Sequence, residues 1–310
     1  MTHVYPDYYK DFKCIADKCT HNCCIGWEIE IDPDTEEFYK SYKGNLSERL
    51  HKDICREEDT SHFILKENDR CPFLNSRNLC DIIIEAGEEH LCTICREHPR
   101  FHNELPKRTE SGLGMCCEEC ARLILTKKEP VSFIYEGDPR TDDEIIELRD
   151  KAIAILQNRE FPLKDRCKNL LEGLNISLPH TDISRWADTL LSLERLDENW
   201  TDILKLLKNP QYTQSTDAFD QYIKGREHEY EQLAVYLIYR HMANAPDIFE
   251  AETRGAFAVL STMLIYSIGS ALYAKQGHFS AEDQTELCRM FSSEIEYSDE
   301  NIYVLYDELS

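Results

Sequence analysis

The stretch Phe12-Lys13-Cys14-Ile15-Ala16-Asp17-Lys18-Cys19-Thr20-His21-Asn22-Cys23-Cys24-Ile25-Gly26-Trp27 begins a run of cysteines that continues to Cys120. Twelve of the fourteen cysteines in the chain lie within this run. Thiols spaced two to four residues apart can converge on one soft cation, and ligands from later in the sequence can close its shell. Only two cysteines follow residue 127, so the pattern predicts one part built around metal and another built around an ordinary core.

The cysteines fall into three groups. The side chains of adjacent residues point in different directions. The pair Cys23-Cys24 in the first group therefore predicts either one ligand from the pair or a bridge between two metal sites. The second group is spaced to complete a tetrahedral shell by itself. We take ten cysteines as candidate metal ligands: Cys14, Cys19, Cys23 and Cys24 from the first group, Cys71, Cys80, Cys92 and Cys95 from the second, and Cys116 and Cys117 from the third.

Two kinds of metal centre compete for these ligands. Cysteine ligation without a matching pair of histidines suits a [4Fe–4S] cluster, and it also suits a closed structural zinc site. His21, His90, His98 and His102 lie near cysteines, and we expect each to be solvated or hydrogen-bonded rather than a ligand. Cys120 completes the third group, and we expect buried or incidental thiols at Cys55, Cys167 and Cys288.

Composition limits the class of protein and its partners. The 310 residues are 42% hydrophobic and 30% charged, which is typical of a soluble globular chain. Asp and Glu number 59 against 35 Lys and Arg, so the net charge of −24 repels phosphate backbones and predicts no nucleic-acid partner. The amino terminus lacks the basic and apolar regions of a signal peptide. We therefore expect a cytoplasmic protein, where clustered thiols are metal ligands rather than disulfides.

The expected fold is mainly α. We predict an irregular, Cys-rich metal-binding domain with a few short strands over residues 1–127, followed by an all-helical bundle over residues 128–310. Helices are predicted after a cap at Asp32, over residues 47–56, 216–241 and 249–275, and after a capping box at Ser280. Cys92 and Cys95 are expected on adjacent turns of a short helix. Residues 256–274 carry no charge, yet their Ser, Thr, Tyr and Gly content favours a buried bundle helix, so no membrane span is predicted. Phosphate-loop, dinucleotide and nucleophile-elbow motifs are absent from the sequence.

The cysteine motifs resemble a known family. The resemblance rests on Phe12-x-Cys14-x4-Cys19-x3-Cys23-Cys24-x-Gly26-Trp27, Cys71-Pro72-Phe73-Leu74, Leu79-Cys80-Asp81-Ile82, Leu91-Cys92-x2-Cys95, Pro99-Arg100 and Cys116-Cys117-Glu118-Glu119. These motifs are similar to those of the flagellin lysine-N-methylase family, which is itself similar to the broader zinc- or iron-chelating cysteine-cluster proteins.

The resemblance implies methyl transfer from S-adenosylmethionine to lysine side chains of flagellin, or of another lysine-bearing protein, and an iron–sulfur cluster held by the cysteines. Such a transfer needs a neutral amine, and a sulfonium donor favours acidic or aromatic walls. No catalytic base or donor-binding residue can be assigned from the sequence, and we expect the substrate site between the two parts. The alternative is a non-catalytic metal-binding or redox-sensing protein whose cluster or zinc is structural.

Overall fold

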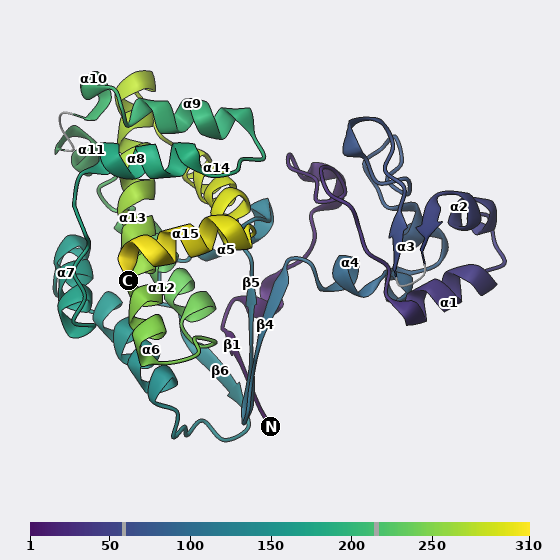
Figure 1. Ribbon diagram of the computed structural model, residues 1–310, viewed down its shortest axis with the longest axis horizontal. Helices are drawn as coiled ribbons and strands as arrows, with labels where there is room; N and C mark the ends of the chain where they lie inside the picture. The colour runs from purple at the N-terminus through teal and green to yellow at the C-terminus, as the bar shows by residue number, and fades with distance from the viewer. Residues whose placement is uncertain (58–59, 214–216) are drawn as a thin grey trace. The chain divides into compact units, whose positions relative to one another are not determined.

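A computed structural model describes residues 1–57, 60–213 and 217–310 (Figure 1). The fold is mainly α, as predicted. The chain forms two compact units, each of which is described by itself: a helical unit of Met1–Phe12 and His102–Ser310, and a cysteine unit of Lys13–Phe101. This division differs from the expected boundary at residue 127, because residues 1–12 and 102–127 pack with the helices rather than with the cysteine-rich segment.

The helical unit contains a sheet with strand order β4-β5-β1-β6. β1 (Thr2–Pro6) pairs parallel with β5 (Arg108–Leu113) and antiparallel with β6 (Phe133–Glu136), while β4 (Arg100–Leu105) is the edge strand next to β5. The expectation of an irregular start to the chain was wrong for β1. Its Val4 is fully buried, because β1 lies between β5 and β6. Both of these strands are more than a hundred residues away in the sequence.

Helices form the rest of the helical unit. They are α5 (Glu118–Leu125), α6 (Glu144–Leu156), α7 (Leu163–Gly173), α8 (Ile183–Ser192), α9 (Glu198–Leu206), α10 (Pro210–Thr213), α11 (Asp217–Tyr222), α12 (Glu227–His241), α13 (Ile248–Gln276), α14 (Ala281–Phe291) and α15 (Asp299–Leu309). A short 3₁₀ turn, η1 (Tyr9–Asp11), follows β1, and a π-helical segment, η5 (Ser292–Glu296), joins α14 to α15.

α13 is the central helix of the bundle, and α6, α9, α12 and α15 pack against it (Figure 1). Among the described residues it is the one helix long and apolar enough to cross a membrane, but 78% of its apolar window is buried inside the protein. The prediction of a core helix is therefore confirmed. The single helix expected over residues 216–241 is instead two helices, because Gly225 adopts a φ of 88° between α11 and α12; Thr216 lies outside the described residues.

The cysteine unit is built from short elements. They are η2 (Ala16–Lys18), α1 (Pro33–Ser41), α2 (Ser47–Lys52), β2 (Ile54–Arg56), β3 (Ser61–Phe63), η3 (Glu67–Asp69), α3 (Asp81–Glu85), η4 (Glu88–His90) and α4 (Thr93–Glu97). The helix expected over residues 47–56 stops at Lys52, since the chain turns into β2 and pairs antiparallel with β3. The core of this unit contains aromatic and aliphatic side chains such as Tyr39, Phe63 and Phe73 together with cysteines.

Asp32 begins α1 as predicted and also ties it to α4. Its Oδ1 accepts a hydrogen bond from the Thr35 backbone N–H at 3.1 Å, which caps the helix. Its Oδ2 accepts from the Thr93 N–H at 2.7 Å, at the start of α4. One carboxylate therefore fixes the position of the helix that carries Cys92 and Cys95.

Candidate functional site

Five cysteines line one region of the cysteine unit. Cys71 and Cys92 belong to its hydrophobic core, and Cys24, Cys80 and Cys95 pack against that core. Their charges influence one another: Cys71 and Cys80 raise the pKa of Cys24, and Cys24 and Cys71 raise that of Cys95. The four cysteines of the second predicted group and Cys24 from the first therefore contact the same hydrophobic core.

Backbone pairing accounts for this convergence. The N–H of Cys71 donates to the carbonyl of Cys24 at 2.8 Å, which aligns two segments almost fifty residues apart. An isolated bridge between Leu74 and Cys80 folds the following turn back on itself. Cys92 precedes the first residue of α4 and Cys95 lies in the first turn of that helix, whereas we expected the two sulfurs on adjacent turns of one helix.

Two pairs of thiols share protons in this unit. A hydrogen bond from Cys24, opposed by burial and aided by His98, lowers the pKa of Cys23 to about 5, while the pKa of Cys24 is raised by the same bond. A hydrogen bond from Cys95 likewise lowers the pKa of Cys92. Each pair thus contains one thiol whose pKa is lowered, which favours the thiolate form that binds metal. Burial raises the pKa of Cys71 to about 11.

The fit of this donor set to a metal centre is mixed. The thiols of Cys24, Cys71, Cys80, Cys92 and Cys95 are the soft donors that zinc and iron–sulfur clusters require. In the described ranges, however, no three His, Cys, Asp or Glu side chains are grouped so that they could hold a metal ion. The thiols are the right type of donor, but some of them occur in hydrogen-bonded pairs rather than as a complete ligand shell for a metal ion.

The other predicted ligands lie elsewhere. Cys14 is exposed and Cys19 half-buried, outside the core of the cysteine unit; the thiol of Cys19 donates to the His21 carbonyl at 3.1 Å. Cys116 and Cys117 belong to the helical unit, immediately before α5. Their part in a shared metal site stays a prediction.

The helical unit contains a buried network of charged and polar groups that the sequence did not reveal. The π-helical segment η5 ends at Glu296, whose side chain is 1% exposed. From α12, Tyr236 donates to this carboxylate at 3.1 Å, His241 Nε2 at 2.8 Å, and Arg240 Nε lies 3.4 Å away. Burial alone would raise the pKa of Glu296, but Arg240 and His241 hold it at about 2. Burial lowers the pKa of His241.

This network reaches a predicted metal ligand at one end. The guanidinium of Arg240 lies 4.6 Å from the ring centroid of Tyr297, and Tyr297 hydrogen-bonds with Cys116. Burial raises the pKa of Cys116 to about 12, despite the hydrogen bond with Tyr297 and the charge of Arg240. Burial therefore favours the protonated form of the Cys116 thiol. At the other end, Arg254 Nη1 donates to the carbonyl of His241 at 3.0 Å.

Arg254 lines a cavity of about 520 Å³ between the turn after α12, the start of α13 and α15. Glu250, Tyr303, Tyr306 and Asp307 are among the other side chains that line it. Aromatic rings and carboxylates are the walls that a cation favours. The lining of this cavity therefore suits a cationic ligand.

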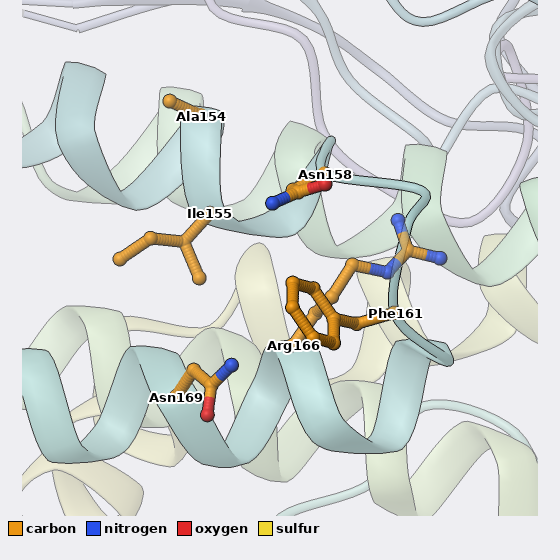
Figure 2. Close-up of a pocket in the computed structure, with 6 residues that line it drawn as sticks. All are labelled: Ala154, Ile155, Asn158, Phe161, Arg166 and Asn169. Carbon is orange, nitrogen blue, oxygen red and sulfur yellow. The ribbon is translucent and has the colours of Figure 1, made fainter.

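A second cavity, of about 260 Å³, lies between α6 and α7 (Figure 2). Ala154, Ile155 and Phe161 give it a mainly apolar lining. Its one charged side chain, Arg166, is committed to the protein, because Nη1 donates to the Leu156 carbonyl and pairs with Glu231 at 2.6 Å. This cavity offers little polar chemistry to a ligand.

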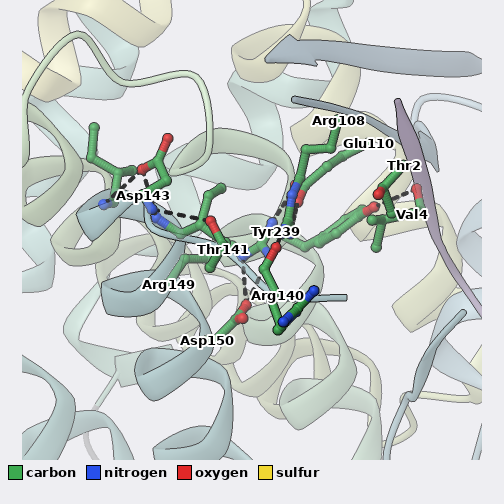
Figure 3. Close-up of polar contacts among 12 residues, drawn as sticks. Thr2, Val4, Arg108, Glu110, Arg140, Thr141, Asp143, Arg149, Asp150 and Tyr239 are labelled. Carbon is green, nitrogen blue, oxygen red and sulfur yellow. Dashed lines mark hydrogen bonds and ion pairs between the residues drawn. The ribbon is translucent and has the colours of Figure 1, made fainter. Parts of the chain in front are cut away.

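A separate cluster joins the sheet to the helices (Figure 3). The buried side chains of Glu110 on β5 and Arg149 on α6 form an ion pair, and the Arg149 guanidinium lies 5.2 Å from the ring centroid of Tyr239 on α12. The Tyr239 hydroxyl lies 3.1 Å from the carbonyls of both Val4 and Ser111. Every member contacts another part of the fold, which indicates a structural role.

Residues 181–310 match the family model described as the FliB lysine N-methylase C-terminal domain. Over 139 residues, 43% of this chain, three curated relatives are each 25% identical to it: the flagellar biosynthetic protein FliU of Salmonella muenchen, with 82% of its length covered, and the lysine-N-methylases of Salmonella choleraesuis and Salmonella typhimurium, each with 35% covered. The match thus spans about a third of the two methylases. No solved structure matches the chain.

Proposed function

Since residues 181–310 belong to the FliB lysine N-methylase family, as the resemblance in the cysteine motifs predicted, we propose that the protein is a protein-lysine N-methyltransferase acting on flagellin. The family match is the observation that carries this proposal. The cavity lined by tyrosines and carboxylates supports it, because that cavity lies wholly within the matched segment.

We further propose S-adenosylmethionine as the methyl donor. In such a transfer the neutral lysine amine attacks the methyl carbon, the carbon–sulfur bond breaks, and S-adenosylhomocysteine leaves as a neutral thioether. The methylated ammonium then loses a proton to solvent or a nearby base. A carboxylate and an aromatic face would stabilise the sulfonium donor before the transfer and the methylated ammonium after it.

We also propose that the cysteines hold a [4Fe–4S] cluster, with zinc as the alternative metal. The best-placed donors are Cys24, Cys71, Cys80, Cys92 and Cys95, since each belongs to or packs against one hydrophobic core. When bound, the metal centre would cross-link three separate stretches of the cysteine unit, and an iron–sulfur cluster would add a redox centre. Iron, acid-labile sulfide and zinc measured per chain after anaerobic purification distinguish the two metals.

We infer the type of binding partner from the net charge of the protein, and its cellular location from the family that it matches. A net charge of −24 favours a lysine-bearing protein over nucleic acid. We propose that the protein works in the cytoplasm, where flagellin is available before export.

The test is incubation of the anaerobically purified protein with methyl-labelled S-adenosylmethionine and flagellin. Label on flagellin lysines is expected, and flagellin with acetylated lysines is the matched control, because it offers no free amine. If neither substrate is labelled by metal-loaded protein, the alternative stands: a non-catalytic metal-binding or redox-sensing protein. The thiols of the cysteine unit support that alternative, because they could bind metal in a protein that has no methyltransferase activity.

A further inference from the structure

The 520 Å³ cavity of the helical unit has the dimensions of a small-molecule site. Surface pockets for such ligands typically measure about 300–1,000 Å³. Its walls come from the turn after α12, the first two turns of α13, and the last half of α15. Because α13 packs against both α12 and α15, the cavity belongs to a well-defined part of the bundle.

Two tyrosines on α15 give the cavity an aromatic wall. Tyr306 is 5% exposed, and the guanidinium of Arg254 lies 5.3 Å from its ring centroid, so this ring already contacts a cation of the protein. Tyr303 is 55% exposed, with its ring centroid 5.9 Å from that of Tyr306 in an edge-to-face arrangement. The ring of Tyr303 is therefore accessible to a ligand from solvent.

The charged groups of the lining favour a positive ligand. Glu250 and Arg254 form an ion pair at 3.2 Å and offset each other. Nη1 of Arg254 is also held, by the carbonyl of His241 at 3.0 Å and by Asn244 Oδ1 at 2.8 Å. The carboxylate of Asp307 has no ion-pair partner among the residues that the structure describes, and it leaves the lining with one net negative charge.

We infer that this cavity binds an alkylated onium cation, an ammonium or a sulfonium, against the ring of Tyr303 and the carboxylate of Asp307. The inference rests on the proposed function, because a lysine methyltransferase has two such ligands: the substrate lysine and the sulfonium methyl donor. An aromatic face attracts either cation through its quadrupole, and the carboxylate adds a direct charge interaction. Arg254 does not contact the ligand in this arrangement; it positions Tyr306 and Glu250, which support the wall formed by Tyr303 and Asp307.

Isothermal titration calorimetry on the full chain tests this with two matched pairs of probes. S-adenosylmethionine is compared with S-adenosylhomocysteine, its uncharged counterpart, and N-acetyl-trimethyllysine amide with N-acetyl-norleucine amide. The variants are Tyr303→Ala, Asp307→Asn and both together. Both positions are exposed, so the fold is expected to persist. Glu308→Gln is the control, since it removes a neighbouring exposed acid of α15 that does not line the cavity.

At least one charged probe is expected to bind more tightly than its neutral counterpart, and the pair that does so identifies the source of the cation. Each single variant should weaken that binding by about 2- to 5-fold and the double variant by about tenfold, with Glu308→Gln unchanged. Equal binding of charged and neutral probes, no binding of either charged probe, or an unaffected double variant overturns the inference.

Failure of the inference and failure of the proposed function give different results. If the wild type methylates flagellin and the double variant retains its kcat/KM, the cavity is not the site although the enzyme assignment holds. If the binding pattern is as expected but no label reaches flagellin, the onium site stands and the proposed methyltransferase activity fails.

Discussion

The Glu296→Gln substitution tests the buried network most directly. It keeps the shape of the side chain and its capacity to accept hydrogen bonds from Tyr236 and His241, but it removes the charge that faces Arg240. The interactions of the ionised form hold the pKa of Glu296 at about 2, against an ordinary value of 4.5. That difference corresponds to about 3 kcal/mol of stability at neutral pH. The cost of breaking a buried ion pair, about 3–5 kcal/mol, is of the same size.

The pH dependence gives this prediction its sign. A carboxylate whose pKa is lower in the folded state stabilises the protein above the unfolded-state pKa, and the stability is lost as the pH falls toward the folded-state value. The difference between wild type and Glu296→Gln should therefore be about 3 kcal/mol at pH 7 and only about 2 kcal/mol at pH 3.5, from the cited pKa of about 2. Most of the loss falls between pH 4.5 and pH 2.

The assay is urea unfolding followed by tryptophan fluorescence in a Trp27→Phe background. Of the three tryptophans, Trp186 and Trp200 then remain, and both are buried in the helical unit, so the signal reports that unit. Glu300→Gln, at an exposed position of α15, is the control and should change stability by less than about 0.5 kcal/mol. A Glu296→Gln difference below 1 kcal/mol, or one that stays constant from pH 7 to pH 3.5, would refute the reasoning.

Three further substitutions test other parts of the structure. Replacing both Cys92 and Cys95 with Ser should reduce the metal content per chain to background, as measured by metal analysis. The control Cys167→Ser, in the helical unit, should leave the metal content unchanged. Full retention of metal in the double variant contradicts the ligand assignment. Gly269→Ala should lower the free energy of unfolding, measured with urea, by about 1 kcal/mol. A Cβ at this position would meet two buried aromatic rings at 3.1 Å and 3.2 Å, and this crowding outweighs the gain in helix propensity. Equal or higher stability of the variant argues against tight packing. Asp32→Ala should cost about 1–2 kcal/mol in the cysteine unit, since a cap and a bond to α4 are both lost, while the Asn variant should retain most of the cap; equal losses in both variants would contradict the capping role.

The sequence predicted the features that depend on local pattern. The sequence was sufficient to predict the helix after Asp32, the short helix that contains Cys95 and the capping box that begins α14, since each depends on residues within one or two turns. The burial of α13 was also predictable, because an uncharged stretch with several hydroxyl groups fits a protein core better than a lipid bilayer.

Features that depend on distant partners were not predicted. β1 carries no strong strand pattern, and it forms because β5 and β6 supply neighbours on both sides. The break between α11 and α12 depends on one left-handed residue, Gly225, within a stretch of good helix formers. Glu296 is oriented inward by a π-helical turn, which shifts the register that a regular helical pattern would assume. No periodicity argument assigns that carboxylate to the core.

The network around Glu296 is difficult to explain by stability alone. A helical core of this size could be filled with apolar side chains, and replacing a buried ion pair by well-packed apolar residues is often neutral or stabilising. What the charged groups provide is fixed geometry: Glu296 anchors His241, whose carbonyl holds Arg254, and Arg254 in turn holds Tyr306 and Glu250 at the cavity. Each step is a directional contact, whereas apolar packing would leave the cavity-lining guanidinium free to choose among rotamers. The buried charge is therefore better understood as the support of the cavity wall than as a source of folding energy.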